Sequence, residues 1–262
     1  MFVRKYISRL KRFYNAIVYK PRQLLRQYVT QSDAKLIRLG TEYGGWTIAD
    51  TPELKHGVAV LCGAGEDVSF DLALQKRYGC AVLTVDPTPR AIEHYRKLAV
   101  AFAQNGSFPI NNGNDNYEFD GVDLKKITYI PTAIWHCNAS LKFWVPLNDD
   151  HVSHSLTNLQ GTQRYIEVRA DTLSAILAAN GFQPTDLTLL KIDIEGAEAA
   201  VIDWICDNAI FPQQILVEFD DVHFPNAASN KKIKEAVERL LECGYRMVYY
   251  DGVSNCLFLQ CN

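Results

Sequence analysis

Three carboxylates mark the segment of this sequence whose residue types and spacing best suit chemistry. Residues 187–192 form an almost continuous apolar run, and Asp193, Glu195 and Glu198 follow it. Such a run is typical of a strand buried on both faces of a parallel sheet. Ligands of open α/β sheets bind beyond the carboxyl ends of these strands. The spacing therefore predicts an acidic ligand site where this strand ends.

The side-chain types are compatible with two kinds of catalysis, and both remain open. Asp193 could be the base that removes a hydroxyl proton, or it could bind a divalent cation that acidifies the hydroxyl. Asp193, Glu195 and Glu218 offer the oxygen ligands that Mg²⁺ prefers. Glu195 is either catalytic or a helix cap, and Glu198 is interpreted as an acid at the positive end of the next helix. His223 is the preferred second base because it follows Glu218 on the same edge.

A glycine-containing turn follows a second apolar strand, at residues 58–62. Its sequence is Gly63, Ala64, Gly65, Glu66, Asp67. Glycines at such a junction let the backbone approach a ligand closely. A dinucleotide fingerprint would need a third glycine where this chain has Val68. Two carboxylates suit a cofactor with an ammonium and a sulfonium better than a pyrophosphate, so we expect residues 63–67 to contact such a cofactor.

The next predicted strand ends in Asp86, 21 residues after Gly65. An acid at this position can accept hydrogen bonds from both hydroxyls of a ribose, and we assign the adjacent Pro87 to the same site. Thr132 and Ala133 follow the third strand of the series and are further candidates for cofactor contacts. The alternative is that the glycines only form a tight turn and that Asp86 caps the following helix.

The elements that must position these residues alternate between strand and helix from about residue 57. This alternation predicts a parallel sheet with right-handed crossovers in a Rossmann-like α/β fold. The loop 251–255 is short enough for a hairpin, so the last strand should run antiparallel.

Residues 104–121 are polar and should form a long loop. Asp171 should cap a helix, and His94 should lie on a helix surface. Strands are expected at 58–62, 81–85, 127–130, 141–145, 165–169, 187–192, 215–219, 245–250 and 256–259, and helices at 68–78, 89–103, 172–179, 197–208 and 230–243.

Residues 1–35 are expected to form a basic, amphipathic helical appendage to a Rossmann-like domain at 36–262. Apolar residues recur at spacings of three and four over 1–30, while residues 1–32 carry eight Lys or Arg and no acid. Pro21 should interrupt the helix. The helix could dock on its own domain or on a partner subunit, it could lie on an anionic membrane surface, or the segment could be disordered. The sequence does not decide between these alternatives.

Composition argues against several classes of protein. The chain has 262 residues, 48% hydrophobic and 22% charged, as an ordinary globular protein does. After residue 32 it carries 19 of the 27 basic residues and all 30 acidic ones, which argues against a nucleic-acid partner. The seven cysteines include no Cys-x-x-Cys pair, no apolar run reaches the roughly 18 residues of a membrane span, and no signal-peptide pattern is found. We predict a cytoplasmic protein, with contact to a membrane surface through residues 1–30 left open.

Four stretches, in order along the chain, resemble the FkbM-type methyltransferases. The segment Lys-Ile-Asp-Ile-Glu-Gly-Ala-Glu at 191–198 is the most specific of them. The resemblance implies a class I methyltransferase sheet with a C-terminal antiparallel hairpin. It also implies S-adenosylmethionine as the donor, and methylation of a hydroxyl oxygen of a sugar or a polyketide-type natural product. The matching stretches are 63–72, 85–90, 190–198 and 215–219.

The resemblance also assigns roles to residues. It implies that the cofactor is lined by Gly63, Ala64, Gly65 and Asp86, and that Asp193 and Glu195 face the reaction centre. Members of this subgroup often have a histidine after the Glu-Phe pair of the fifth strand. This chain has Asp220 and Asp221 there, with His223 two residues further on.

These observations predict an S-adenosylmethionine-dependent O-methyltransferase that acts on a hydroxyl of a sugar, a glycan or a secondary metabolite. One alternative is a nicotinamide-dependent oxidoreductase. Another is a catalytically inactive binding module with the same fold. The sequence identifies neither the methyl acceptor nor the oligomeric state, and it does not establish whether a metal is required.

Overall fold

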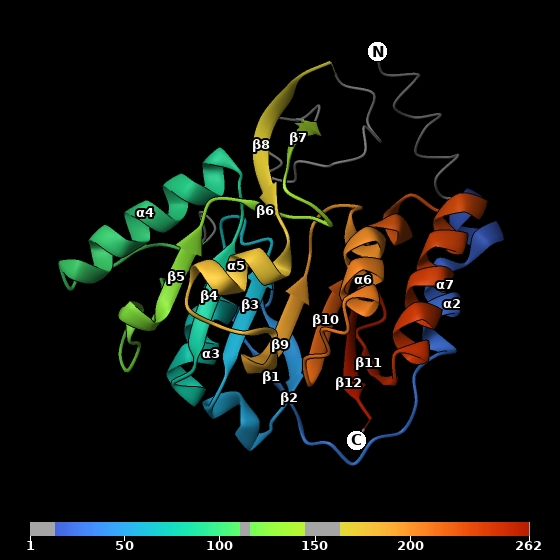
Figure 1. Cartoon of the computed structure of the whole chain (residues 1–262), viewed down its shortest axis with the longest axis horizontal. Helices are drawn as coiled ribbons and strands as arrows, with labels where there is room; N and C mark the ends of the chain where they lie inside the picture. Colours follow the sequence, from blue (N-terminus) through green and yellow to red (C-terminus); the bar gives the residue numbers. More distant parts are fainter. Residues whose placement is uncertain (1–13, 111–115, 145–162, 262) are drawn as a thin grey trace.

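The computed structural model describes residues 14–110, 116–144 and 163–261, and its centre is a seven-stranded sheet (Figure 1). The strand order is β11-β12-β10-β9-β3-β4-β5. All neighbours pair in parallel except β12, which is antiparallel to both β10 and β11. The predicted antiparallel last strand is therefore confirmed. The bounds are β3 Val58–Cys62, β4 Ala81–Val85, β5 Ile127–Ile130, β9 Leu187–Ile192, β10 Gln214–Glu218, β11 Tyr245–Tyr250 and β12 Asn255–Gln260.

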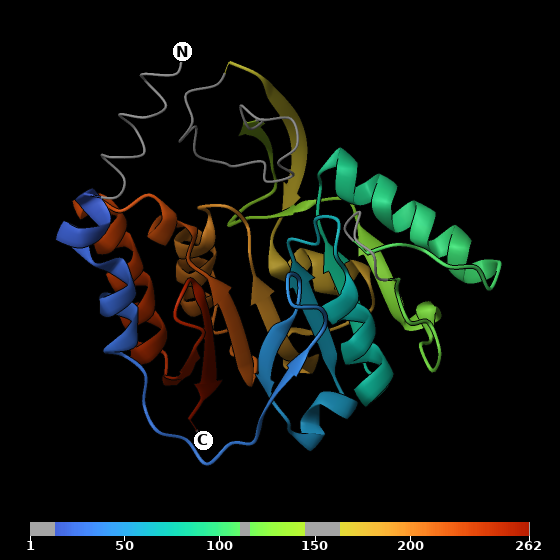
Figure 2. The same cartoon turned by 180° about the vertical axis from the view of Figure 1, so that it is seen from behind.

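Helices cover both faces of this sheet, as Figures 1 and 2 show from opposite sides. One face packs on α5 (Leu173–Ala179), α6 (Glu198–Asp207) and α7 (Ala227–Glu242). The other packs on α3 (Ser69–Tyr78), α4 (Pro89–Ala103) and the hairpin of β1 (Leu36–Leu39) and β2 (Trp46–Ala49). The core is thus split into two apolar layers, and the sheet between them is buried on both sides.

Local sequence explains where several elements begin and end. All five residues of β3 are buried, as its continuous apolar run predicts. The helix α4 begins at Pro89, where a missing N–H costs little, and α3 ends at Gly79 in the left-handed conformation. For α5 the prediction of an Asp171 cap was wrong. Thr172 is the cap, because its side chain accepts a hydrogen bond from the Ala175 N–H, while Asp171 ends strand β8 (Tyr165–Asp171).

A second, three-stranded sheet lies beyond the carboxyl ends of the central strands (Figure 1). Its order is β6-β8-β7, with β6 at Ala133–Ile134 and β7 at Ala139–Trp144. Residues 141–145 and 165–169 were expected to be strands, and Tyr165 pairs with Trp144 in this sheet. Four short 3₁₀ helices complete the described elements, namely η1 Pro52–Lys55, η2 Leu124–Lys126, η3 Pro184–Asp186 and η4 Asp220–His223.

The helix α2 of the N-terminal segment docks on the domain itself. Lys20 has a left-handed φ of 45°, and α2 (Pro21–Arg26) begins directly after it, so Pro21 separates two helical pieces as predicted. Leu25 is fully buried in the layer that contains α7, and the Tyr28 hydroxyl donates to Glu238 of α7 at 3.2 Å. Residues 1–13 of the predicted basic helical appendage lie outside the described residues. Within the described ranges, no helix is both long enough and apolar enough to span a bilayer.

Candidate active site

The turn of residues 63–67, here called the glycine turn, lies at the carboxyl end of β3 and packs directly on the end of β9. Gly63 has φ +84°, and a Cβ placed on it would lie 1.8 Å from the carbonyl oxygen of Asp193. Gly65 has φ +52°, but a Cβ there would meet no described atom within 4 Å. The first glycine is therefore required by close packing between two strand ends, whereas the second borders open space. The glycine turn and Asp193, which the sequence predicts to belong to one site, are therefore in contact.

Asp86 fixes the conformation of the glycine turn. Its Oδ2 accepts hydrogen bonds from the backbone N–H groups of Ala64 and Gly65, both at 3.0 Å. Its Oδ1 accepts from the N–H of Thr88 at 2.8 Å and from the Thr88 hydroxyl at 2.6 Å. A carboxylate has about four lone-pair positions, so ribose hydroxyls could bind Asp86 only by sharing or replacing one of these donors. The Thr88 hydroxyl, which can rotate, is the easiest donor to replace. Pro87 is half-buried beside it.

The two acids of the glycine turn already have partners within the chain. Glu66 forms an ion pair with Arg90 of α4. Asp67 is buried, accepts from the Ser69 N–H at 2.9 Å, and accepts from the Thr41 hydroxyl at 2.6 Å. Asp67 therefore stabilises the start of α3. That both acids bind a cofactor remains a prediction.

The described part of the loop 104–121 returns to the glycine turn. Tyr117 is buried, and its hydroxyl accepts from the Val68 N–H at 3.1 Å and lies 2.8 Å from Nε2 of His94. His94 was expected on a helix surface, but it is buried beneath Tyr117 and Phe108. Its pKa is lowered, because burial disfavours the charged imidazolium. Tyr117 of this loop thus holds Val68, the residue directly before α3, in place.

Lys191 ties the ends of β3 and β9 together. Its Nζ is buried and donates to the carbonyl oxygen of Gly63 at 2.6 Å and to that of Cys62 at 3.3 Å. It also forms an ion pair with Asp193 at 2.8 Å and lies 5.2 Å from the ring centroid of Trp46. Lys191 therefore orients the Asp193 carboxylate.

Five carboxylates gather at the ends of β9 and β10, and we call this group the acidic edge. Burial raises the pKa of Glu218, of Glu198 and, most strongly, of Asp220, and the neighbouring acids raise all three further. Asp193 contributes to each of these shifts. Close like charges in a buried place are unfavourable unless a proton or a cation compensates them. The acidic edge consists of Asp193, Glu195, Glu198, Glu218 and Asp220.

The backbone at the start of α6 positions two acids of the acidic edge, Glu195 and Glu198. Glu195 has a left-handed φ of 54°, although it is not a glycine, and such conformations are often found at functional sites. Glu198 is buried, and its Oε1 accepts the N–H of Gly196 at 2.8 Å. Glu198 lies in the first turn of α6, where an acid interacts favourably with the helix dipole, but no side chain caps this helix. Catalytic roles for Asp193 and Glu195 remain predictions.

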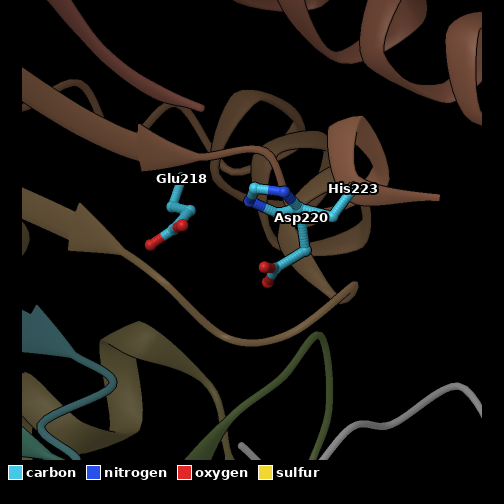
Figure 3. A group of neighbouring side chains, drawn as sticks. All are labelled: Glu218, Asp220 and His223. Atoms are coloured by element: carbon cyan, nitrogen blue, oxygen red, sulfur yellow. The ribbon is translucent and has the colours of Figure 1, made fainter. Parts of the chain in front are cut away.

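Glu218, Asp220 and His223 form a compact group at the end of β10 (Figure 3). One potential ligand atom from each side chain lies within 4.8 Å of the other two. Figure 3 shows the His223 ring extending from η4 toward Glu218, while the two carboxylates point to the same side of the strand end. The metal candidates from sequence were Asp193, Glu195 and Glu218. Of these, only Glu218 belongs to the three-ligand group found in the described ranges, because Asp220 and His223 take the other two places.

The candidates after β5 are less accessible than expected. The Thr132 hydroxyl donates to the carbonyl oxygen of Arg169 at 2.9 Å, and Ala133 is buried in strand β6. Both residues join the central sheet to the three-stranded sheet. Their contact with a cofactor remains a prediction.

Sequence reasoning missed the turn between β1 and β2, which reaches both parts of the site. The Thr41 hydroxyl contacts Asp67, and a Cβ on Gly44 would lie 2.5 Å from the same carboxyl group. The ring of Tyr43 is 72% exposed. Its pKa is raised by partial desolvation of its hydroxyl and by the charges of Asp193 and other acids at this edge. The adjacent glycines at 44 and 45 were the available signal for a hairpin at this position.

Comparison with known proteins identifies the family. The description "Methyltransferase FkbM domain" matches residues 61–247, which is more than two thirds of the chain. A solved structure described as monomeric WbdD is similar at 12% sequence identity and a TM-score of 0.39. That similarity covers 78% of this chain and 36% of the other, so the present chain spans about a third of that protein's length. No curated protein matches the chain significantly. The chain belongs to the family of FkbM methyltransferase domains.

Proposed function

We propose that the chain is an S-adenosylmethionine-dependent O-methyltransferase whose acceptor is a hydroxyl group of a sugar, a glycan or a secondary metabolite. One observation carries the proposal. The glycine turn and Asp193 meet at adjacent strand ends, with Gly63 packed on the Asp193 carbonyl oxygen. The predicted cofactor turn and the predicted base are therefore neighbours at the carboxyl edge of one sheet, where α/β enzymes bind ligands.

The residues at this edge fit the proposed cofactor in character. Gly65 borders open space, so the backbone there is accessible to a ligand. Glu66 and Asp193 keep partly exposed carboxylates beside it, and these would favour the ammonium and the sulfonium of the cofactor. Asp86 holds the turn in shape and would face the ribose. When bound, the cofactor supplies an electrophilic methyl group on a positively charged sulfur.

The side chains of the chain itself would do three things. Asp193, oriented by Lys191, would take the proton from the acceptor hydroxyl as its oxygen attacks the methyl carbon. The glycine turn would hold the donor in line with that oxygen, which supplies much of the rate enhancement by position alone. The acidic edge beyond Asp193 would contact the polar acceptor.

Calorimetric titration with S-adenosylhomocysteine and, separately, with NAD tests the cofactor. We expect saturable binding of the first, and binding of NAD alone would overturn the proposal in favour of an oxidoreductase. Transfer of labelled methyl to a panel of glycans and small molecules tests the reaction. Asp193→Asn should keep S-adenosylhomocysteine binding but lose about 100-fold or more in transfer rate. A wild-type chain that binds the cofactor and methylates no acceptor would favour the inactive binding module.

A further inference from the structure

The group Glu218, Asp220 and His223 contains a buried carboxylate oxygen for which the described residues provide no hydrogen-bond donor. Asp220 is 8% exposed, and its Oδ2 has no hydrogen-bond partner among the described residues. A buried carboxylate oxygen without a donor is costly. Native proteins meet this cost with a donor, a proton or a metal ion.

Nearby donors are directed to other acceptors. Lys191 is committed to Asp193 and to two backbone carbonyls. Lys232 forms an ion pair with Asp221 at 3.0 Å. The Ser254 hydroxyl donates to Glu218 at 3.0 Å. Among the described residues, four other acids therefore add negative charge around Asp220, while Lys191 and Lys232 are paired with other acids.

The geometry of the three side chains suits one ion. Metal–ligand distances of roughly 2.0–2.2 Å place the ligand atoms of a single ion up to about 4.4 Å apart. The three candidate atoms already lie within 4.8 Å of one another, so small side-chain rotations would complete the site. Two residues, Asp220 and His223, come from the same short helix η4, and Glu218 ends the strand before it.

We propose that Glu218, Asp220 and His223 bind one divalent transition-metal ion, of which Mn²⁺ is the representative. Two carboxylates and one imidazole form a mixed donor set. Carboxylates suit Mg²⁺ and Mn²⁺, while imidazole favours a softer ion than Mg²⁺. The expected preference is therefore Mn²⁺ over Mg²⁺, in contrast to the Mg²⁺ site that the oxygen ligands Asp193, Glu195 and Glu218 suggested.

The position of the ion gives it a role that rests on the proposed function. Glu218 and Asp220 interact electrostatically with Asp193, so an ion there adds positive charge beside the proposed base. Such a charge stabilises the developing negative charge on an acceptor oxygen. The O–H proton passes to Asp193, the oxygen forms the new bond to the methyl carbon, and the electrons of the broken carbon–sulfur bond stay on sulfur.

Metal binding is tested on the full chain by titrating Mn²⁺, with electron paramagnetic resonance to count free ion and thermal unfolding to follow stabilisation. The wild type should bind one Mn²⁺ per chain and should unfold at a higher temperature when saturated. Asp220→Asn and His223→Ala should each weaken binding at least tenfold. Glu235→Gln, an exposed acid of α7, and His56→Ala, an exposed histidine, are matched controls that should bind as the wild type does.

The Asp220→Asn variant also shows whether Asp220 is a metal ligand or has only a structural role. The substitution replaces a buried carboxyl group, one oxygen of which has no donor among the described residues, by a neutral amide of the same size, so the metal-free variant should be at least as stable as the metal-free wild type. Its unfolding temperature should no longer respond to Mn²⁺. No uptake of Mn²⁺ by the wild type, or uptake by Asp220→Asn at wild-type affinity, would overturn the proposal.

Titration with S-adenosylhomocysteine on the same samples keeps the two proposals distinct. Binding of S-adenosylhomocysteine without Mn²⁺ uptake would remove the metal site and leave the proposed methyltransferase intact. Mn²⁺ uptake without cofactor binding would support the metal site and refute the proposed function. If His223→Ala does not fold, as judged by circular dichroism, His223→Gln takes its place.

Discussion

The contact between Gly63 and Asp193 predicts that two glycines of one turn respond very differently to the same substitution. In Gly63→Ala the new Cβ lies 1.8 Å from the Asp193 carbonyl oxygen. The two strand ends must therefore separate by at least 1.2 Å to reach the 3.0 Å below which real Cβ contacts essentially do not occur. The same methyl group on Gly65 meets no described atom within 4 Å.

The difference can be worked out from two costs. A left-handed backbone costs an alanine about 1–2 kcal/mol, and this cost applies to both positions. Overpacking costs a further 1–3 kcal/mol or so, and it applies to Gly63 alone. We expect Gly63→Ala to lower the free energy of unfolding by about 2–5 kcal/mol, which is roughly 10 °C in unfolding temperature for a chain of this size. Gly65→Ala should lower it by only about 1–2 kcal/mol.

Urea denaturation followed by circular dichroism measures both values, and an unchanged slope with urea would confirm that only stability has changed. The affinity of each variant for S-adenosylhomocysteine is the second measurement. Because Gly65 borders open space, Gly65→Ala should fold and yet bind S-adenosylhomocysteine more weakly. Equal losses of stability in the two variants would refute the assignment of Gly63 to close packing. Unaltered affinity in Gly65→Ala would place the cofactor elsewhere.

Three further predictions concern other parts of the fold. Burial raises the pKa of Asp71 from its ordinary 3.8 to about 6, so ionisation penalises the folded state. The penalty is absent below about pH 4, grows between pH 4 and 6, and reaches about 3 kcal/mol above pH 6. Urea denaturation should therefore show that the wild type loses stability relative to Asp71→Asn as the pH rises from 4 to 6. A difference in stability that does not change with pH would contradict the burial of the Asp71 carboxyl group. Lys191→Met should cost about 1–3 kcal/mol because it removes the buried donor of two backbone carbonyls and of the partly exposed Asp193. No loss of stability would argue against the role of Lys191 in joining the two strand ends. Leu25→Ala should cost about 2–5 kcal/mol, with the exposed Ile17→Ala as control, and equal small effects would mean that α2 does not dock on α7 in solution.

Much of the central sheet could be predicted because its elements carry strong local signals. The apolar runs of β3 and β9 can only be buried strands, and Pro89 sets the start of α4 correctly. The glycine turn and Asp193 were recognised because each follows such a run directly. Parallel strands bring their carboxyl ends to one edge, so the assembly of these residues follows from the topology.

The rest depends on contacts between residues far apart in the sequence. The hairpin β1–β2 is short and was missed, although its turn reaches Asp67. The burial of His94 results from Tyr117 in a loop that seemed merely polar. The local sequence does not show which carboxylate of the acidic edge has no hydrogen-bond donor among the described residues. That depends on which acids the neighbouring lysines, Lys191 and Lys232, pair with in the folded chain. Asp220 could therefore not be chosen from sequence.

The position of β12 in the central sheet has a consequence for how the domain opens. β12 hydrogen-bonds to β10 on one side and to β11 on the other, so detaching it exposes amides of three strands together. Such a group behaves as one cooperative unit in hydrogen exchange. Because β10 leads directly into Glu218 and Asp220, any fluctuation that frees β12 would also disorder the end of β10. The slowest-exchanging amides of β10, β11 and β12 should share a single opening free energy, and a ligand bound at the end of β10 should raise it for all three strands.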